Sequence, residues 1–223
     1  MQGSTASGRP AAPEDLLWAL RAQGIGDRRV LAAFRAIPRA RFVPPQLTHL
    51  AYEDEPIPIP HGQVTTQPSL IARMVEALRL AAGERVLEVG TGLGFQTAIL
   101  AELAGEVVSI ERFADLAAQA RANLAGAGLG RVEVVVGDGT LGVPEHAPYH
   151  AVVVAAASPR IPAPLVEQLA EGGRLVHPVG PGGQEVVTLF RKQGDRLVAD
   201  AELTAAHFVP LVAGRAEQRP GRP

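Results

Sequence analysis

Short apolar runs alternate with segments of helical periodicity along the middle of the chain. The runs at 85–89, 106–110, 132–136, 151–155 and 174–179 predict strands, and the segments 95–103, 116–124 and 164–169 predict helices. Nearly continuous apolar strands that alternate with helices are typical of a parallel sheet covered on both faces. The pattern therefore predicts an α/β fold with a Rossmann-like, doubly wound and mostly parallel sheet.

Two helices are expected before this alternation. Asp27 can cap the first, which has one apolar face and would end at Pro38. The second begins at Pro68 and would end before Gly83. Between them, the stretch 41–68 holds too many prolines for a helix or a central strand, so an ordered, extended segment laid over the rest of the molecule is expected.

The two ends of the chain depart from the alternating pattern. The segments 185–190, 196–198 and 208–211 predict strands with short connections, which indicates an antiparallel edge that completes the sheet. Residues 1–12 and 214–223 are small, polar and proline-containing, so a flexible tail is expected at each end. No internal repeat or linker divides residues 13–213, which predicts a single domain.

Composition narrows the classes of function. The 223 residues carry a formal net charge of −2 and include no cysteine, so disulfides, thiol nucleophiles and thiolate metal sites are excluded. An electrostatic nucleic-acid binder would show a basic surplus. No run approaches the roughly 20 apolar residues that span a bilayer, and the N-terminus lacks a secretory pattern. We expect a monomeric cytoplasmic protein that binds neither nucleic acid nor membrane.

The strongest chemical signal is a glycine-rich turn directly after the first strand of the alternation. It contains Gly90, Thr91, Gly92 and Gly94, and such turns lie at the carboxyl ends of the strands, where ligands bind. A dinucleotide fingerprint would need glycine at the position of Phe95. The G-x-G-x-G spacing after an acidic strand instead predicts a nucleoside methyltransferase. Glu88, within that strand, is counted with the site, although it could hydrogen-bond the turn instead.

Acidic residues follow the next two strands at the same edge of the sheet. Glu111 could accept hydrogen bonds from two ribose hydroxyls, and Asp138 could accept one from an adenine amino group. Their neighbours Arg112 and Gly139 are counted with this cofactor site. Taken alone, Glu111 could cap a helix and Asp138 could form a turn. Three such features on consecutive strands favour a cofactor site.

With these motifs in place, the sequence closely resembles the protein-L-isoaspartate O-methyltransferases from about Asp27 to Leu211. The matching segments are AYEDEPIPI, GQVTTQP, VLEVGTGLGFQTAILAEL, VSIER, GDG, EGGRLVHPVG and FVPL. The resemblance implies methylation of the free α-carboxylate of L-isoaspartyl residues in damaged proteins and peptides. The ester then closes to a succinimide, which hydrolyses partly to aspartate. S-adenosyl-L-methionine would be the donor and S-adenosyl-L-homocysteine the product.

The resemblance also places the acceptor side. It implies that the Thr66 hydroxyl lies beside the acceptor carboxylate. The other implied substrate-binding residues are Gln63, Val64, Thr65, Val209 and Leu211. The family usually has serine at position 66, and threonine keeps the hydroxyl while stiffening χ1. An ionised carboxylate needs no general base, so the protein has to supply orientation and exclusion of water.

Other departures from the family pattern concern the substrate range. Leu93 replaces a usual serine, Phe95 a usual tyrosine, His150 a usual aspartate, and His207 a frequent arginine. The histidines at 61, 150 and 207 are not at metal-ligand spacing, so no metal is expected and these side chains are expected at the surface or the rim.

Within the predicted domain, the segment 13–82 is expected on the substrate side, and 83–213 is expected to form the cofactor-binding core and the C-terminal strands. Two other functions fit the same fold. One is a related carboxyl methyltransferase that acts on aspartate in a dedicated biosynthetic peptide, although no recognition extension is evident. The other is a protein that senses S-adenosylmethionine without catalysis. A nucleic-acid methyltransferase is disfavoured, because Ala155-Ala156-Ala157-Ser158 stands where its Asn/Asp-Pro-Pro-Tyr/Phe segment would be.

Overall fold

A computed structural model describes residues 11–181 and 183–214 and contains a sheet in the order β5-β4-β3-β6-β7-β8-β9. The strands are β3 (Arg85–Val89), β4 (Glu106–Glu111), β5 (Glu133–Val136), β6 (Tyr149–Val154), β7 (Leu169–Val179), β8 (Glu185–Gln193) and β9 (Arg196–Ala206). β3 to β7 pair in parallel, whereas β8 and β9 are antiparallel additions. The predicted α/β fold with an antiparallel C-terminal edge is confirmed.

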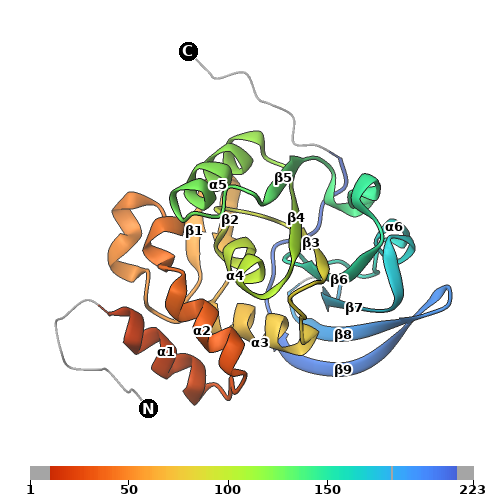
Figure 1. Cartoon of the computed structure of the whole chain (residues 1–223), viewed down its shortest axis with the longest axis horizontal. Coiled ribbons are helices and arrows are strands. Elements are labelled where there is room, and N and C mark those ends of the chain that lie inside the picture. Colours follow the sequence, from red (N-terminus) through yellow and green to blue (C-terminus); the bar gives the residue numbers. More distant parts are fainter. Residues whose placement is uncertain (1–10, 182, 215–223) are drawn as a thin grey trace.

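Helices cover the two faces of the sheet unequally. One face carries α1 (Pro13–Ala22), α2 (Arg28–Ala36), α3 (Pro68–Leu78), α4 (Phe95–Leu103) and α5 (Ala114–Gly126), while the short α6 (Ala163–Glu167) lies on the other. Figure 1 shows α1, α2 and α3 gathered on one side of the molecule. Alternate residues of β3 serve the two cores: Val86 packs under the large helical layer, and Leu87 and Val89 pack on the opposite face.

The N-terminal segment corrects the sequence expectation in two places. α1 was not expected, and it buries one apolar face made by Leu16, Leu17 and Leu20. The stretch 41–68 is not extended throughout. It contains the end of a 3₁₀ turn at Arg39–Phe42, further 3₁₀ turns at Pro45–Leu50 and Pro60–Gly62, and the antiparallel hairpin of β1 (Ile57–Ile59) and β2 (Gln63–Thr65). Proline is tolerated in the first turn of a helix, so it starts two of these turns rather than preventing them.

The C-terminal segment also differs from the prediction. The strand expected at 196–198 continues to Ala206, because β9 pairs along almost the whole length of β8. The segment 208–211 is not a strand of the sheet. It is held beside the end of β6 by Ala157, whose N–H donates to Val209 and whose carbonyl accepts from Leu211. These two hydrogen bonds form a single parallel bridge between Ala157 and Pro210, outside the named strands.

Some expectations fall partly outside the described residues. Of the expected tail 1–12, residues 1–10 lie outside them, and Ala12 precedes α1 as its N-cap. Of the expected tail 214–223, only Gly214 is described. Within the described part of the chain, no helix is long and apolar enough to cross a membrane.

Candidate active site

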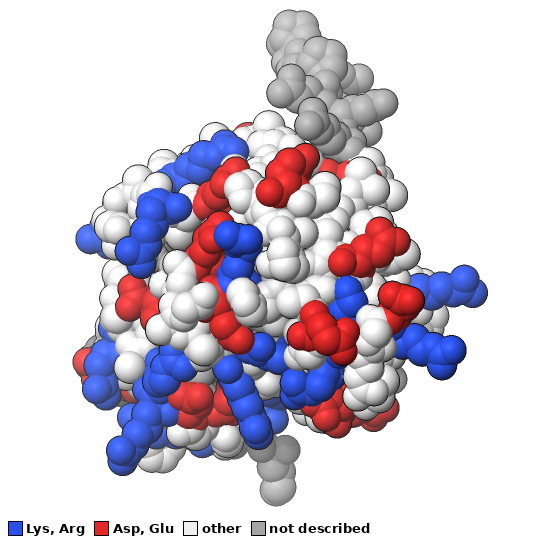
Figure 2. Space-filling model, turned by 45° about the vertical axis from the view of Figure 1, so that its right-hand side comes forward, with Lys and Arg blue, Asp and Glu red and all other residues white. Residues whose placement is uncertain are grey.

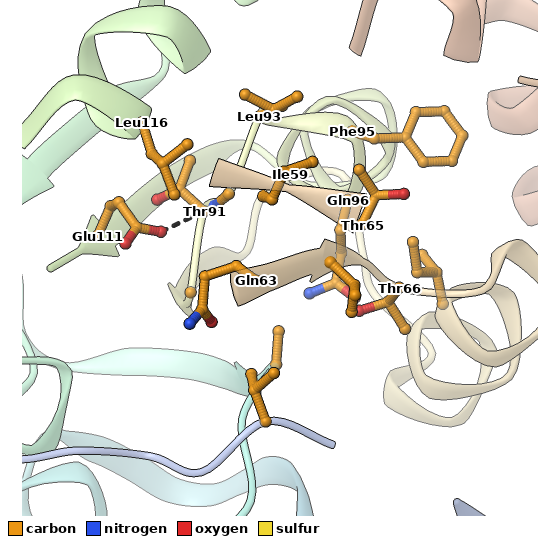
Figure 3. Close-up of a pocket in the computed structure, with 16 residues that line it drawn as sticks. Ile59, Gln63, Thr65, Thr66, Thr91, Leu93, Phe95, Gln96, Glu111 and Leu116 are labelled. Atoms are coloured by element: carbon orange, nitrogen blue, oxygen red, sulfur yellow. Dashed lines mark hydrogen bonds between the residues drawn. The ribbon is translucent and has the colours of Figure 1, made fainter. Parts of the chain in front are cut away.

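A pocket opens at the carboxyl ends of β3, β4 and β6, beneath the β1–β2 hairpin. The lining residues are Ile59, Gln63, Val64, Thr65, Thr66, Ile71, Gly90, Thr91, Gly92, Leu93, Phe95, Gln96, Glu111, Leu116, Ala155 and Val209. Figure 3 shows Glu111 and Leu116 at one end and Thr66 with Phe95 at the other. The pocket lies where the strand order reverses, between β3 and β6.

The glycine turn forms the floor of this pocket. Gly90, Gly92 and Gly94 have φ angles of +97°, +56° and +95°, a region that side chains with a Cβ rarely adopt. A Cβ on Gly92 would lie in van der Waals contact with Ile59 Cδ1, at 3.5 Å. Thr91 is buried, and its hydroxyl lies 2.6 Å from that of Ser109. The turn therefore brings main chain rather than side chains to the cavity.

Glu111 ends β4 with its carboxylate against the turn. One oxygen accepts from the Gly92 N–H at 2.9 Å, and the other accepts from the Phe113 N–H at 3.0 Å. The side chain is only 6% exposed, and this burial raises the pKa of Glu111 above its ordinary value. A carboxylate has about four acceptor positions, so two remain for hydroxyl donors of a ligand.

The structure does not bring Glu88 to the pocket. Its side chain is fully buried below the turn, where it accepts hydrogen bonds from Gln96, Thr97 and Ser109. Burial raises the pKa of Glu88 to about 7. Ser109 also contacts the Thr91 hydroxyl, so Glu88 reaches the turn only through Ser109, whereas the second sequence interpretation allowed a direct hydrogen bond to the turn.

A second pocket adjoins the first on the β5 side. It shares Gln63, Gly90, Glu111, Ala155 and Val209 with the first pocket, and its further lining residues are Val89, Ile110, Arg112, Phe113, Gly139, Ala156, Pro210, Leu211 and Val212. The two therefore form one continuous depression along the ends of the strands.

The residues predicted after β4 and β5 have different places around this second pocket. A Cβ on Gly139 would lie 2.5 Å from Val89 Cγ1, so glycine is required there. Arg112 lies over the Phe113 ring and has a buried Nε with no partner among the described residues. Asp138 is not in the lining, because its carboxylate accepts from the N–H and hydroxyl of Thr140 and from the N–H of Gly214.

A groove lies on the other side of Thr66. Its lining includes Glu55, Gln67, Arg73, His207 and Phe208, and it shares Val64, Thr66, Ala155 and Val209 with the first pocket. Of the residues expected on the acceptor side, Thr66, Val64 and Val209 lie at this boundary. Gln63 faces the two cofactor-side pockets, and Leu211 lines only the second of these. The Thr65 hydroxyl is buried and accepts from Arg39 at 2.9 Å.

Several pocket residues were not found from the sequence. Ile59, Leu116 and Ala155 supply apolar walls, and the buried Gln96 Oε1 has no partner among the described residues. His61 lies at the hairpin tip, stacked 4.1 Å from Phe113 and 2.7 Å from Asp115. The AYEDEPIPI segment could have indicated Ile59. Leu116 and Ala155 come from separate elements, and nothing in the sequence around them indicates that they line a pocket. In the described part of the chain, no three His, Asp or Glu side chains gather as a metal site would require.

Comparisons with known proteins agree with this geometry. The model of a family described as protein-L-isoaspartate(D-aspartate) O-methyltransferase (PCMT) matches residues 11–216. A protein-L-isoaspartate O-methyltransferase of Methanoculleus marisnigri is 56% identical over 86% of this chain and 87% of its own length. One of Aeropyrum pernix is 48% identical over 84% of this chain and 74% of its own.

Solved structures show the same fold. One protein-L-isoaspartate O-methyltransferase has a TM-score of 0.79 at 31% identity, and the match covers 89% of this chain and 65% of that chain. A PCMT from Plasmodium falciparum, in complex with S-adenosyl-L-homocysteine, has a TM-score of 0.78 at 23% identity over 91% of this chain and 99% of its own.

The sheet order and the glycine-turn pocket define a Rossmann-like methyltransferase. Within this class, the chain belongs to the protein-L-isoaspartate(D-aspartate) O-methyltransferase family. The resemblance read from the sequence is thereby confirmed.

Proposed function

We propose that this enzyme transfers a methyl group from S-adenosyl-L-methionine to the free α-carboxylate of L-isoaspartyl residues in damaged proteins and peptides. The observation that carries the proposal is the place of Thr66. It lines both the pocket at the glycine turn and the groove beside it, so it stands where a donor and an acceptor would meet. Its hydroxyl has no hydrogen-bond partner among the described residues and is free to donate to a carboxylate.

The donor side fits the nucleoside of S-adenosylmethionine. Glu111 has acceptor positions left for ribose hydroxyls, and the apolar Leu116 and Ile59 offer walls for flat or aliphatic parts. The unpartnered Arg112 Nε and Gln96 Oε1 are further groups that a polar ligand could satisfy. When bound, the donor supplies an electrophilic methyl group on a sulfonium. In the proposed site, Gly90, Gly92, Gly94 and Thr91 hold it from below, and Gly139 and Arg112 flank its base. Asp138, which is engaged by Thr140 and Gly214, lies outside this lining.

The acceptor side needs little chemistry from the protein. A carboxylate is ionised at neutral pH and attacks without a general base. Thr66 would orient it by a hydrogen bond, while Val64, Val209 and the hairpin keep water away. Once esterified, the α-carbonyl carries a good leaving group, so the neighbouring main-chain nitrogen displaces methanol and closes the succinimide that reopens partly as aspartate.

One face of the molecule shows how the charged side chains are distributed. On the face drawn in Figure 2, acidic and basic side chains are interspersed, and the described residues there form no continuous cationic track. We also propose that residues 13–213 act as one domain, and that the protein is a monomer in the cytoplasm. Light scattering at assay concentration would give a dimer mass if the monomer proposal were wrong.

The test of the proposed activity uses S-adenosylmethionine labelled in its methyl group. The substrate is a short isoaspartyl peptide, and the control is the same peptide with normal aspartate. We expect base-labile label on the isoaspartyl peptide alone, because a carboxyl methyl ester hydrolyses readily. If neither peptide is labelled while calorimetry shows cofactor binding, the activity is wrong, and a dedicated peptide substrate or a non-catalytic sensor becomes the better account.

A further inference from the structure

Among the described residues, Arg39 is the largest fully buried side chain. Its guanidinium donates to the carbonyls of Ala51 at 3.3 Å, Glu53 at 2.9 Å and Glu55 at 3.0 Å. It also donates to the Thr65 hydroxyl at 2.9 Å and to the Thr66 carbonyl at 3.5 Å. One cation therefore joins the loop 51–55 to the main chain at Thr66.

Such a buried charge is costly and needs an explanation. Burial lowers the pKa of Arg39 to about 10, so the group stays charged at neutral pH, and the charge of Asp54 favours this state. Its Nε has no partner among the described residues. An apolar side chain of similar size would often serve stability as well as a buried charge does. The arrangement is better explained by what the guanidinium holds than by a gain in stability.

The loop 51–55 also binds the chain on the C-terminal side of Thr66. Asp54 accepts from the Ser69 N–H at 2.8 Å and from the Gln67 side chain at 3.1 Å. It thereby caps the start of α3, whose own N-cap residue makes no side-chain cap. Thr66 thus lies between two anchored points, Thr65 and the first turn of α3, both held from the loop 51–55.

Arg39 also packs against Phe95, a residue in the wall of the donor pocket. Its guanidinium carbon lies 5.7 Å from the centre of the Phe95 ring, and Phe95 lines the pocket at the end where Thr66 lies. A single buried group therefore contacts both the wall of the donor pocket and the main chain of the residue at the acceptor boundary.

We propose that Arg39 is a positioning residue for methyl transfer: its guanidinium fixes the main chain at Thr65 and Thr66, and so sets where the Thr66 hydroxyl meets the acceptor. This inference rests on the proposed function. Arg39 touches neither pocket in the described structure, so it acts through Thr66 and through the loop that it binds. A misplacement of about 1 Å can cost as much as 10²-fold in rate, which is the scale of effect expected here.

The test compares Arg39→Lys with a pair of substitutions at its partner, Thr65→Val and Thr65→Ser. Valine has the shape of threonine but cannot accept the Arg39 hydrogen bond, whereas serine can. The matched control is Arg29→Lys, because Arg29 also clamps main-chain carbonyls, those of Leu80 and Leu103, far from the pocket. For each variant, kcat and KM for the isoaspartyl peptide, cofactor affinity by calorimetry and Tm are measured.

We expect Arg39→Lys to lower kcat by about 30-fold and Thr65→Val by about tenfold, with cofactor affinity changed less than about twofold. The kcat of Thr65→Ser should exceed that of Thr65→Val by about fivefold. A double variant that combines Arg39→Lys with Thr65→Val should have a kcat no lower than that of Arg39→Lys alone, because both substitutions break the same hydrogen bond. Arg29→Lys should lower Tm without lowering kcat.

Two results would overturn the inference. One is a Thr65→Val enzyme with the kcat of the wild type, and the other is a loss of kcat matched by an equal loss of cofactor affinity. The Thr65 pair keeps the test decisive even if Arg39→Lys does not fold. Failure of the proposed function would look different, because the wild-type enzyme itself would then leave the isoaspartyl peptide unmethylated.

Discussion

The donor and acceptor halves of the site are built in different ways. The donor half consists of turns that directly follow consecutive strands, so Gly90, Gly92 and Glu111 are fixed by the sheet itself. The acceptor half joins the segment around Thr66 to the segment around Val209, which lie far apart in the sequence. Its parts are held by a few long-range hydrogen bonds, made by Arg39 and Asp54 on one side and by Glu185 and Ala157 on the other. The donor half is therefore a product of the fold, whereas the acceptor half depends on a few long-range hydrogen bonds.

The largest expected effect comes from filling the donor half. Gly92→Leu puts a branched side chain at φ +56°, beside Ile59 in the lining of the pocket, so cofactor affinity should fall by about 10³-fold or more, roughly 4 kcal/mol. The control is Gly194→Leu, which imposes the same backbone strain at φ +59° in open space on the β8–β9 turn. Calorimetry that finds normal affinity in Gly92→Leu would show that the pocket is not the cofactor site.

The next largest effect is on the free energy of unfolding and comes from Glu88, which lies beneath the donor turn. The pKa of Glu88 lies at about 7 instead of 4.5, so the folded state holds this proton more tightly than the unfolded state. The stability that the protonated Glu88 contributes is fully present below pH 4.5 and is lost as the pH rises through 7. The free energy of unfolding should therefore fall by about 2–3 kcal/mol between pH 5 and pH 8. Glu88→Gln should lack this loss. Urea unfolding at both pH values measures it, and an equal pH dependence in both proteins would show that Glu88 does not titrate as described.

In the acceptor half, Thr66→Ala should lower kcat by about 10²-fold while cofactor affinity changes little, because only the orientation of the acceptor is lost. Thr66→Ser keeps the hydroxyl and should recover most of the turnover. Steady-state kinetics with the isoaspartyl peptide, beside calorimetry with the cofactor, separate the two halves. Unchanged turnover in Thr66→Ala would remove this hydroxyl from the reaction.

A smaller effect is expected at Glu185. This fully buried carboxylate accepts from the Phe208 N–H at 3.0 Å and so, together with Ala157, helps to hold Val209 beside the groove. Glu185→Leu leaves that N–H unpaired, a cost of about 1–3 kcal/mol, and should raise KM for the peptide about tenfold without affecting cofactor affinity. Glu185→Gln keeps an acceptor oxygen and should have the smaller effect. A rise in the cofactor Kd instead would show that the two halves are not independent.

The sequence by itself determined the donor half of the site much more than the acceptor half. The alternation of apolar runs and helices, the glycine turn and Glu111 are local features with a fixed place in a parallel sheet, and the structure has them at one edge. The resemblance to the family was visible in short segments and is confirmed. The roles of the individual site residues stay predictions, to be decided by the experiments above.

Only the tertiary structure decided what the polar side chains face. A sequence pattern cannot distinguish Glu88, sealed below the turn, from Glu111 at the pocket, or show that Asp138 is engaged by Thr140 and Gly214. It gives no sign that Arg39 joins the loop 51–55 to Thr65. Hydrophobic periodicity shows which face of a single helix or strand is buried. A hydrogen bond between residues far apart in the sequence depends instead on how separate elements pack against each other.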